Sequence, residues 1–344
     1  MHIKIKQLEI KNNKVLYYNN LKIKRISKEV ENFINNNPIF NTTEVAKKLL
    51  LQDLDYDLNN LIKDETLKDQ KSYRNLINAY KYIFSGIEIN QSSLNKLYQI
   101  LSKSLLDEYE INNMSEYYRN KDVYILNNKS HFLNDFNKGI ESFKITEYMN
   151  NLLTFINEDT SKSAIDEFIK SQIFHFYFVY IHPYFDVNGR TSRTAAMWYL
   201  LNKEAYPYLF FSRAITFSKD QYKKSILTSI KKGNITVFLE YILKSLLEEL
   251  KKEKVIKEIE KTTSLSLIDK QVILCFLSLK KNKSIEELAL LLNGYDLHKF
   301  LDKTIKEKIY PLILRNILQI TFNNQLILNK DIFNKNTFYQ KIKN

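Results

Sequence analysis

The side chains best suited to chemistry are gathered in one twelve-residue segment, residues 182–193 (HPYFDVNGRTSR). It contains an imidazole, a carboxylate, a carboxamide, a glycine and two arginines. An ordinary histidine has a pKa of about 6.5, so His182 is neutral often enough at cellular pH to accept a proton. Pro183 disfavours helical geometry at the residue before it. We therefore expect the incoming helix to end at His182 and to leave its ring in a loop.

The second half of the segment has the features of an anion-binding helix start. Asn188 is a good N-cap residue, and Gly189 allows close approach of the backbone. The first N–H groups of a helix lack internal acceptors and bind anions. Arg190 and Arg193 are three residues apart, so both guanidinium groups can point along one helix face toward a polyphosphate.

Each of these features also has a simpler interpretation. Asn-Gly is a common hairpin turn, but the helical sequence on both sides of Asn188-Gly189 argues against a hairpin. The run from Asp186 to Gly189 resembles part of a calcium loop, yet the spaced carboxylates and the closing glutamate of that loop are missing. His182 alone would more often be structural than catalytic. The joint spacing of the segment favours the catalytic interpretation.

Composition limits the class of protein. The 344 residues are 44% hydrophobic and 26% charged, with only 5 Gly and 4 Pro. This composition is typical of an ordered, mostly helical protein that is long enough for two domains. The single cysteine, Cys275, excludes an internal disulfide and lies in an apolar run, so we expect it to be buried. We find no secretory signal and no apolar run of about 20 residues, and we expect a cytoplasmic protein.

The net charge of +13 raises the question of nucleic-acid binding. The lysines are scattered among acidic residues and do not form a stripe. Charge alone is a weak indicator of a binding site. We therefore favour a solvated basic surface and retain a polyanion site as the alternative.

Helical periodicity dominates the first two thirds of the chain. Residues 1–20 are strand-like or irregular. Apolar residues then recur at three- and four-residue spacing, which predicts a mostly α protein. The expected helices are 27–36, 43–62, 69–85, 91–107, 145–156, 161–181, 189–203, 219–231 and 234–252. The extended stretch 119–126, followed by the polar residues 127–130, predicts a small β-hairpin.

The last third predicts a separate module. The charged run 246–261 is typical of a solvated helix that leads out of the first domain. Three short helices are expected at 264–279, 284–292 and 295–308, followed by two strands within 317–328 around Asn323-Asn324. Three helices closed by a strand pair are the outline of a winged helix. We expect an extension at 1–26, a main domain at 27–252 and this winged-helix-like domain at 253–344.

The segment 182–193 resembles the motif of Fic proteins, His-Pro-Phe-x-(Asp/Glu)-Gly-Asn-Gly-Arg-x-x-Arg. Two specified positions differ. Tyr184 replaces Phe, which is a mild change, and Val187 replaces the first Gly, which restricts the loop. Residues 206–222 resemble the family segment that follows the motif helix, and the likeness extends over about 27–245. It implies a Fic-type helical bundle with a small hairpin flap.

The resemblance also implies two accessory elements. Arg119, Val123 and Ile125 correspond to a flap that positions the target by strand addition. The run 27–32 (SKEVEN) matches the family's inhibitory motif (Ser/Thr)-x-x-x-Glu-(Gly/Asn) and lies before the core. This predicts Ser27, Glu31 and Asn32 as an inhibitory element of the class with an N-terminal inhibitory helix. A charged helix face could match by chance.

The implied activity is protein adenylyl transfer: a Ser, Thr or Tyr hydroxyl attacks the α-phosphate of ATP. His182 would be the base and Asp186 the Mg²⁺ ligand. Asn188, Gly189 and Arg190 would hold the phosphates. By resemblance, Arg193 would bind the γ-phosphate, and Glu31 would inhibit by pairing with Arg193. The partner would be a protein with an accessible hydroxyl, the chain itself included, and a homodimer is possible.

Three alternatives remain at this stage. The same site could chiefly remove AMP, with Glu31 orienting a water molecule. The chain could be a DNA-binding regulator in which the Fic core only senses nucleotide. Residues 255–344 hold 15 Lys and Arg against 9 Asp and Glu, but the expected third helix mixes both signs, which is a poor face for phosphates. Finally, Val187 could silence the core and leave a binding module. A family variant that phosphorylates carries Lys where this chain has Gly189.

Overall fold

The computed structural model describes residues 9–10, 14–15, 20–37, 40, 67–125, 137–159, 163–216, 218–279, 284–292, 301–329 and 331. The chain divides into two compact units, residues 1–247 and 248–344. The boundary lies inside a long helix, a few residues before the expected division at 252. The expected helix 43–62 and the expected strand-like residues before Glu9 lie outside the described residues.

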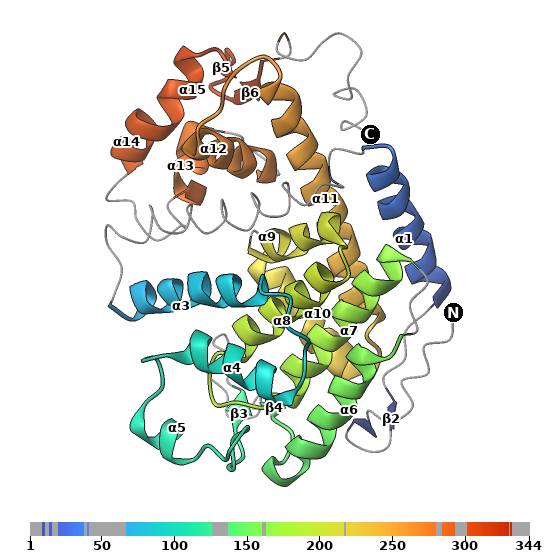
Figure 1. Cartoon of the computed structure of the whole chain (residues 1–344). Helices are drawn as coiled ribbons and strands as arrows, with labels where there is room; N and C mark the ends of the chain where they lie inside the picture. Colours follow the sequence, from blue (N-terminus) through green and yellow to red (C-terminus); the bar gives the residue numbers. More distant parts are fainter. Residues whose placement is uncertain are drawn as a thin grey trace. The chain divides into compact units, whose positions relative to one another are not determined.

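The first unit is mostly helical, as expected, and Figure 1 shows its arrangement. Its helices are α1 (Asn20–Asn35), α3 (Leu67–Ile83), α4 (Gln91–Ser102), α5 (Glu108–Asn112), α6 (Ile145–Asn157), α7 (Ala164–Ile181), α8 (Asn188–Asn202), α9 (Phe211–Thr216), α10 (Lys219–Lys232) and the first half of α11 (Thr236–Glu260), with short 3₁₀ turns η3 (Ser142–Lys144) and η4 (Tyr206–Phe210).

Helix α7 forms the core of this unit. Its residues are apolar on nearly all sides, and almost all of them are buried, which is the pattern of a helix surrounded by others. Ser163 caps its N-terminus by accepting a hydrogen bond from the Asp166 N–H. α6 and α8 both pack against it (Figure 1).

Helix α8 is enclosed on several sides. It contacts α3, α4, α7 and η4, and nearly every residue from Thr191 to Leu200 is buried. The Trp198 indole N–H donates to the main-chain oxygen of Ile87, 2.9 Å away. The N-terminus of α8, which carries the motif, is therefore fixed by the packing of the whole helix.

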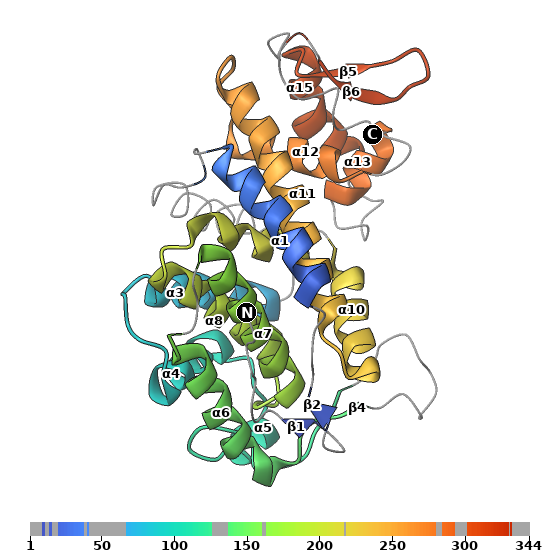
Figure 2. The ribbon, with the colours of Figure 1, turned by 90° about the vertical axis from the view of Figure 1, so that its right-hand side faces the viewer.

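Helix α1 lies against this bundle through a buried stripe formed by Ile23, Ile26, Val30 and Ile34. Three- and four-residue spacing places these side chains on one face. Lys22 at its start pairs with Glu240 of α11 at 2.5 Å, and Figure 2 shows α1 beside that helix. α1 is thus a docked helix, and it begins earlier than the expected residue 27.

Two hairpins accompany the helices. β1 (Glu9–Ile10) pairs with β2 (Lys14–Val15), and β3 (Tyr124–Ile125) pairs with β4 (Asn137–Lys138), both antiparallel. The second hairpin contains the expected flap. The polar residues 127–130 suggested a short turn with the second strand directly after it, but β4 begins only at Asn137.

The second unit consists of helices followed by a hairpin. After the end of α11 come α12 (Leu267–Ser278), α13 (Ile285–Leu292), α14 (Leu301–Thr304), a π-helical turn (Ile305–Ile309) and α15 (Tyr310–Leu314). β5 (Leu318–Ile320) then pairs antiparallel with β6 (Leu326–Leu328). This order agrees with the sequence expectation, and Cys275 is buried in α12. None of the described helices is both long and apolar enough to cross a membrane.

Candidate active site

The motif forms the loop between α7 and α8, and a left-handed residue stands at each end of this loop. His182 ends α7 with φ 54° and ψ 60°, and Val187 precedes α8 with φ 65° and ψ 4°. The sequence correctly placed the end of the helix at His182. A left-handed backbone costs a non-glycine residue about 1–2 kcal/mol, and a β-branched residue is least suited to it. The loop therefore keeps a strained backbone at Val187, where the family motif has Gly.

Asn188 holds this loop closed. Its Oδ1 accepts from the Tyr184 N–H at 3.0 Å, and its Nδ2 donates to the Tyr184 main-chain oxygen at 2.8 Å. The side chain is only 2% exposed. Asn188 is the first residue of α8, and Val187 is the N-cap. The expected N-cap role is therefore wrong, because the amide is used to bridge the loop.

The hydrogen bond of His182 defines its tautomer. Nδ1 lies 3.3 Å from the main-chain oxygen of Val179. A carbonyl oxygen can only accept, so Nδ1 carries the proton and Nε2 keeps its lone pair. Burial lowers the pKa of His182 to about 4; Arg119 adds to this effect, while the Val179 bond and Asp186 oppose it. His182 is thus neutral at cellular pH, with Nε2 as a proton acceptor.

Arg119 anchors the loop from the side of the flap. Its Nε donates to the His182 main-chain oxygen at 2.8 Å, and Nη2 donates to that of Ile140 at 2.6 Å. Nη1 reaches the Lys121 oxygen at 2.5 Å, and the Arg119 N–H bonds the Pro183 oxygen at 3.0 Å. With 1% exposure, this side chain cannot contact a target, so the expected target-positioning role of Arg119 is corrected to that of an anchor.

The flap hairpin itself begins beside this anchor. The Val123 main-chain oxygen accepts from the Gly139 N–H at 2.9 Å, and Ile125 pairs with Asn137. A Cβ at Gly139 would lie 3.0 Å from Nη2 of Arg119, so the absence of a side chain there gives the guanidinium its space.

The head of α8 offers the expected anion site. The N–H groups of Asn188 and Gly189 have no acceptor among the described residues, while the Thr191 N–H already bonds the Val187 oxygen at 2.9 Å. A Cβ at Gly189 would meet only Nη1 of Arg193, at 3.4 Å, and otherwise open space. Gly189 therefore keeps open a cradle that no atom of the described residues fills.

The two arginines leave this helix in different directions. Nη1 of Arg190 donates to the Ser72 hydroxyl of α3. Nη1 of Arg193 lies over Gly189, and its guanidinium also lies near the hydroxyl of Tyr222 in α10. Ser72 and Tyr222 were not predicted as site residues, because they are 118 and 29 positions away in the sequence from the arginines that they contact.

Asp186 is the acidic group of the loop. Its Oδ1 accepts from the Val187 N–H at 2.6 Å, which leaves Oδ2 for another ligand. No cluster of three or more His, Cys, Asp or Glu side chains occurs in the described part of the chain. Mg²⁺ that accompanies a nucleotide commonly takes one or two carboxylates together with phosphate oxygens and waters. A single half-buried carboxylate beside a phosphate cradle fits this mode.

Comparison with known proteins agrees with the motif. Residues 88–200 match the model of the Fic/DOC family. The chain contains a Fic domain. The crystal structure of a Fic family protein from Desulfovibrio desulfuricans G20 has a similar fold, with a TM-score of 0.55 and 17% identity over 88% of this chain and 92% of that chain. At this identity the likeness is one of fold alone.

The Fic family match extends from Glu88 to Leu200, and so includes α4, the flap, α7 and the motif. Fic domains typically transfer AMP or another nucleotide group to proteins. α1, α10 and the second unit lie outside the matched range.

The expected inhibitory residues lie on α1 but not at the motif. Burial and the neighbouring carboxylate of Asp166 raise the pKa of Glu31. Within the described residues, Glu31 makes no ion pair with Arg193. Glu31 lies near Asp166, in the first turn of α7. Arg193 instead lies near His175, which is nine residues, or about 13 Å, further along the same helix. The expected Glu31–Arg193 pair is therefore absent. The Ser27 hydroxyl is buried without a partner in the described chain, and Asn32 is exposed.

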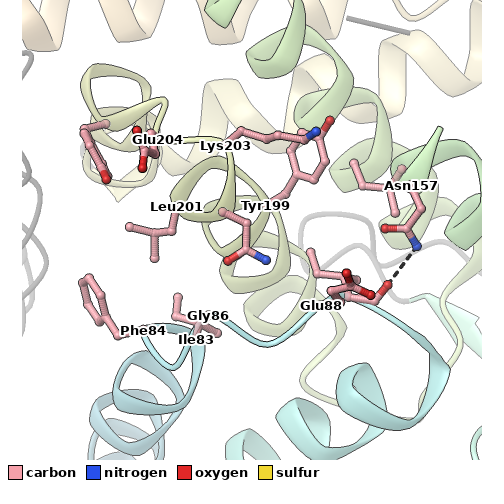
Figure 3. Close-up of a pocket in the computed structure, with 13 residues that line it drawn as sticks. Ile83, Phe84, Gly86, Glu88, Asn157, Tyr199, Leu201, Lys203 and Glu204 are labelled. Carbon is pink, nitrogen blue, oxygen red and sulfur yellow. Dashed lines mark hydrogen bonds between the residues drawn. The ribbon is translucent and has the colours of Figure 1, made fainter. Parts of the chain in front are cut away.

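A separate cavity of about 700 Å³ lies at the opposite end of α8 (Figure 3). Glu88, Lys203 and Glu204 supply its charges. Nδ2 of Asn157 donates to the Ile89 oxygen at 2.8 Å, shown by the dashed line in Figure 3. The cavity contains none of the predicted site residues, so it is distinct from the motif loop.

Proposed function

We propose that this chain is a protein adenylyltransferase that moves AMP from ATP onto a Ser, Thr or Tyr hydroxyl of a protein. One observation carries the proposal. A neutral His182, whose Nε2 has no hydrogen-bond partner in the described part of the chain, lies in the loop that leads directly into the amide cradle of α8. A proton acceptor beside an anion site is what phosphoryl-group transfer to a hydroxyl requires.

In the proposed reaction, the target oxygen attacks the α-phosphorus of ATP and forms a new P–O bond. The bond from this phosphorus to the oxygen that bridges the α- and β-phosphates breaks, and pyrophosphate leaves. The hydroxyl proton passes to Nε2 of His182. The N–H groups of Asn188 and Gly189 stabilise the charge that develops on the phosphate oxygens, because they point toward it before the reaction begins.

The remaining residues orient this centre. Asp186 would hold Mg²⁺, which neutralises phosphate charge when bound. Arg190 and Arg193 supply cations for the phosphates, with Arg193 on the γ-phosphate. Arg119 keeps His182 in place through its main-chain oxygen. An extended target segment would add to the flap near Val123 and Ile125, so that main-chain hydrogen bonds orient its hydroxyl.

Autoinhibition by α1 is part of the proposal. Glu31 lies beside a like charge, Asp166, and movement of Glu31 toward Arg193 would exchange repulsion for attraction. A Glu31–Arg193 pair would deny the γ-phosphate its cation. The described arrangement would then be the released one, and Ser27 and Asn32 would act in the paired one.

The direct test is incubation with ATP labelled in its α-phosphate, followed by autoradiography of the protein. We expect weak self-labelling of the wild type, stronger labelling of Glu31→Gly and none of His182→Ala. Equal labelling of all three would refute the transfer scheme. Equal labelling of wild type and Glu31→Gly, with none in His182→Ala, would refute only the inhibitory role.

The same preparation distinguishes the related activities. Release of AMP from a modified target without forward transfer would identify the reverse reaction as the main one. Nucleotide binding without transfer would indicate a core silenced by Val187. Intact mass after incubation with each nucleoside triphosphate identifies the donor.

For the second unit we propose a winged-helix fold with a structural or protein-binding role. The order of helices and hairpin supports the fold. The wing segment Asn316–Asn329 contains no charged residue, and Phe322 at its tip is fully exposed. Salt-dependent DNA binding comes from Lys and Arg that neutralise phosphates, and this wing supplies none. We therefore expect truncation at about Lys254 to leave any salt-dependent retention on duplex DNA unchanged.

A further inference from the structure

His175 is a completely buried histidine on α7, seven residues before His182. Its exposure is 0%, and its ring stacks on Tyr222 of α10 with centroids 5.6 Å apart and planes at 19°. Phe238 of α11 packs edge-on against the same ring at 5.7 Å. Residues seven apart lie on the same face of a helix, two turns apart. His175 therefore lies two turns before the motif loop, inside the core of the bundle.

The hydrogen bonds of His175 have only one possible direction. Nε2 of Gln172 donates to the Ser171 hydroxyl at 3.1 Å, and this hydroxyl donates to the Phe168 main-chain oxygen at 2.7 Å. Oε1 of Gln172 faces Nδ1 of His175 at 3.3 Å. An amide oxygen only accepts, so Nδ1 carries the proton and Nε2 of His175 is an acceptor.

The next member of the chain is the Tyr222 hydroxyl, 2.8 Å from Nε2 of His175. Because that nitrogen accepts, the hydroxyl must donate its only proton to it. The lone pairs of the Tyr222 oxygen then remain for another donor. The Arg193 guanidinium lies close enough to this hydroxyl to act on it electrostatically, while its Nη1 lies next to Gly189 at the head of α8.

We propose that His175 and Tyr222 are positioning residues for Arg193. The hydrogen-bonded chain Gln172–His175–Tyr222 fixes an acceptor oxygen near the guanidinium, whose Nη1 lies at the phosphate cradle. An arginine side chain loses considerable rotamer freedom when it is fixed, and a preset position removes that loss from nucleotide binding.

This chain of hydrogen bonds can form only while His175 is neutral. A protonated ring would donate from Nε2, and the Tyr222 hydroxyl could no longer give its proton to it. Burial, and next the Arg193 charge, hold the pKa of His175 well below its ordinary value. Arg193, the cation that these hydrogen bonds position, thus also helps to keep His175 neutral.

This inference rests on the proposed function, because it takes the γ-phosphate as the ligand of Arg193. A purely structural role for the aromatic cluster is the alternative. The two differ in which part of the nucleotide is affected. Positioning of Arg193 concerns ATP alone, whereas general loosening of the core would weaken all nucleotides.

The test is Tyr222→Phe in the full chain, which keeps the stacked ring and removes one oxygen. Titration calorimetry with ATP, ADP and AMP in Mg²⁺ should show ATP affinity reduced about tenfold, as expected for one hydrogen bond to a charged group, and AMP affinity unchanged. Tyr241→Phe is the matched control, because the Tyr241 hydroxyl bonds Ser218 at 2.6 Å beside the same cluster. An equal loss for all three nucleotides, or no loss for ATP, would overturn the proposal.

Coupling to Arg193 is tested in the Arg193→Ala background. Tyr222→Phe should have no further effect on ATP affinity there, because its only route to the nucleotide has been removed. An undiminished tenfold loss in that background would mean that Tyr222 acts by another route, and would contradict the inference.

Two variants of His175 test whether its hydrogen-bond acceptor or the shape of its ring matters. His175→Gln can present an amide oxygen to the Tyr222 hydroxyl, whereas His175→Phe fills the space without an acceptor. We expect the ATP preference over AMP to be retained in the first and lost in the second. The opposite order, with both variants folded, would show that ring shape matters and the hydrogen bond does not.

A readout without nucleotide distinguishes failure of this inference from failure of the proposed function. The chain has seven arginines, so ¹⁵N-arginine labelling gives few Nε–H signals. The Arg193 signal should indicate a rigid side chain in the wild type and a mobile one in Tyr222→Phe. If the wild type binds no nucleotide, the proposed function fails while this result still tests the positioning chain. An Arg193 equally mobile in both proteins would overturn the inference.

Discussion

Nε of Arg119 lies 2.8 Å from the main-chain oxygen of His182. A buried cation on the flap side thus holds the backbone of the proposed base. Arg119→Lys leaves a single ammonium group where three guanidinium nitrogens served three carbonyls. We expect the free energy of unfolding to fall by about 3 kcal/mol, because buried oxygens lose their donors. The midpoint of urea unfolding measures this change.

The same variant should lower the labelling rate more than tenfold, since His182 loses its anchor. Arg25→Lys is the control: Arg25 is exposed on α1, and its replacement should change stability by less than about 0.5 kcal/mol. If Arg119→Lys unfolded at the same urea concentration as the wild type, the anchor would have no energetic role.

The low pKa of His182, about 4, should determine how both activity and stability depend on pH. Below this pKa the ring is protonated and cannot accept the target proton, so the acid limb of kcat/KM should lie near pH 4 and not near 6.5. In the unfolded chain the ring takes up its proton near the ordinary pKa. Between those two values the unfolded state binds more protons, so stability falls as pH falls.

His182→Asn removes this titration while keeping a residue that tolerates left-handed geometry. The difference in unfolding free energy between wild type and variant should therefore change between pH 6.5 and 4, by at most about 3 kcal/mol. His175 is present in both proteins and cancels. An acid limb at pH 6.5 or above in the wild type would show that His182 titrates normally.

Val187 provides a test of backbone geometry. At most positions Ala is more stable than Gly, because Gly has more freedom in the unfolded chain. At φ 65° the order should be reversed, with Val187→Gly more stable than Val187→Ala by about 1 kcal/mol. Thermal unfolding of the two variants measures this difference. We also expect Val187→Gly to bind ATP more tightly than the wild type, because its loop adopts the bound geometry at lower cost.

The sequence was most informative where structure is locally determined. Pro183 and the helical periodicity predicted the end of α7 at His182, and the same periodicity predicted α8, α10 and the order of elements in the second unit. Gly189 was predicted as an open position for the same kind of reason. These features depend on residues close together in the chain.

The features that sequence reasoning missed depend on distant contacts. Asn188 bridges the loop instead of capping α8, because Val187 takes the left-handed turn. β4 is only two residues long, and its partner is set by tertiary packing. The contact between His175 and Tyr222 joins residues 47 positions apart. The only sequence signal for it was a second histidine, seven residues before His182.

Tyr184 replaces the Phe of the motif, and its substitution by Phe should increase stability, whereas Arg119→Lys should decrease it. Its ring is fully buried and stacks on Tyr98 at 3.6 Å, while its hydroxyl has no partner among the described residues. Burying an unpaired hydroxyl costs free energy. Tyr184→Phe should therefore raise the free energy of unfolding by about 1 kcal/mol and leave labelling unchanged, because the ring and its stack remain. Tyr199→Phe, which removes a hydroxyl that donates to Glu167, should lower stability by about the same amount. Urea unfolding of the two variants gives both signs in one experiment, and a loss of stability in Tyr184→Phe would mean that its hydroxyl has a partner after all.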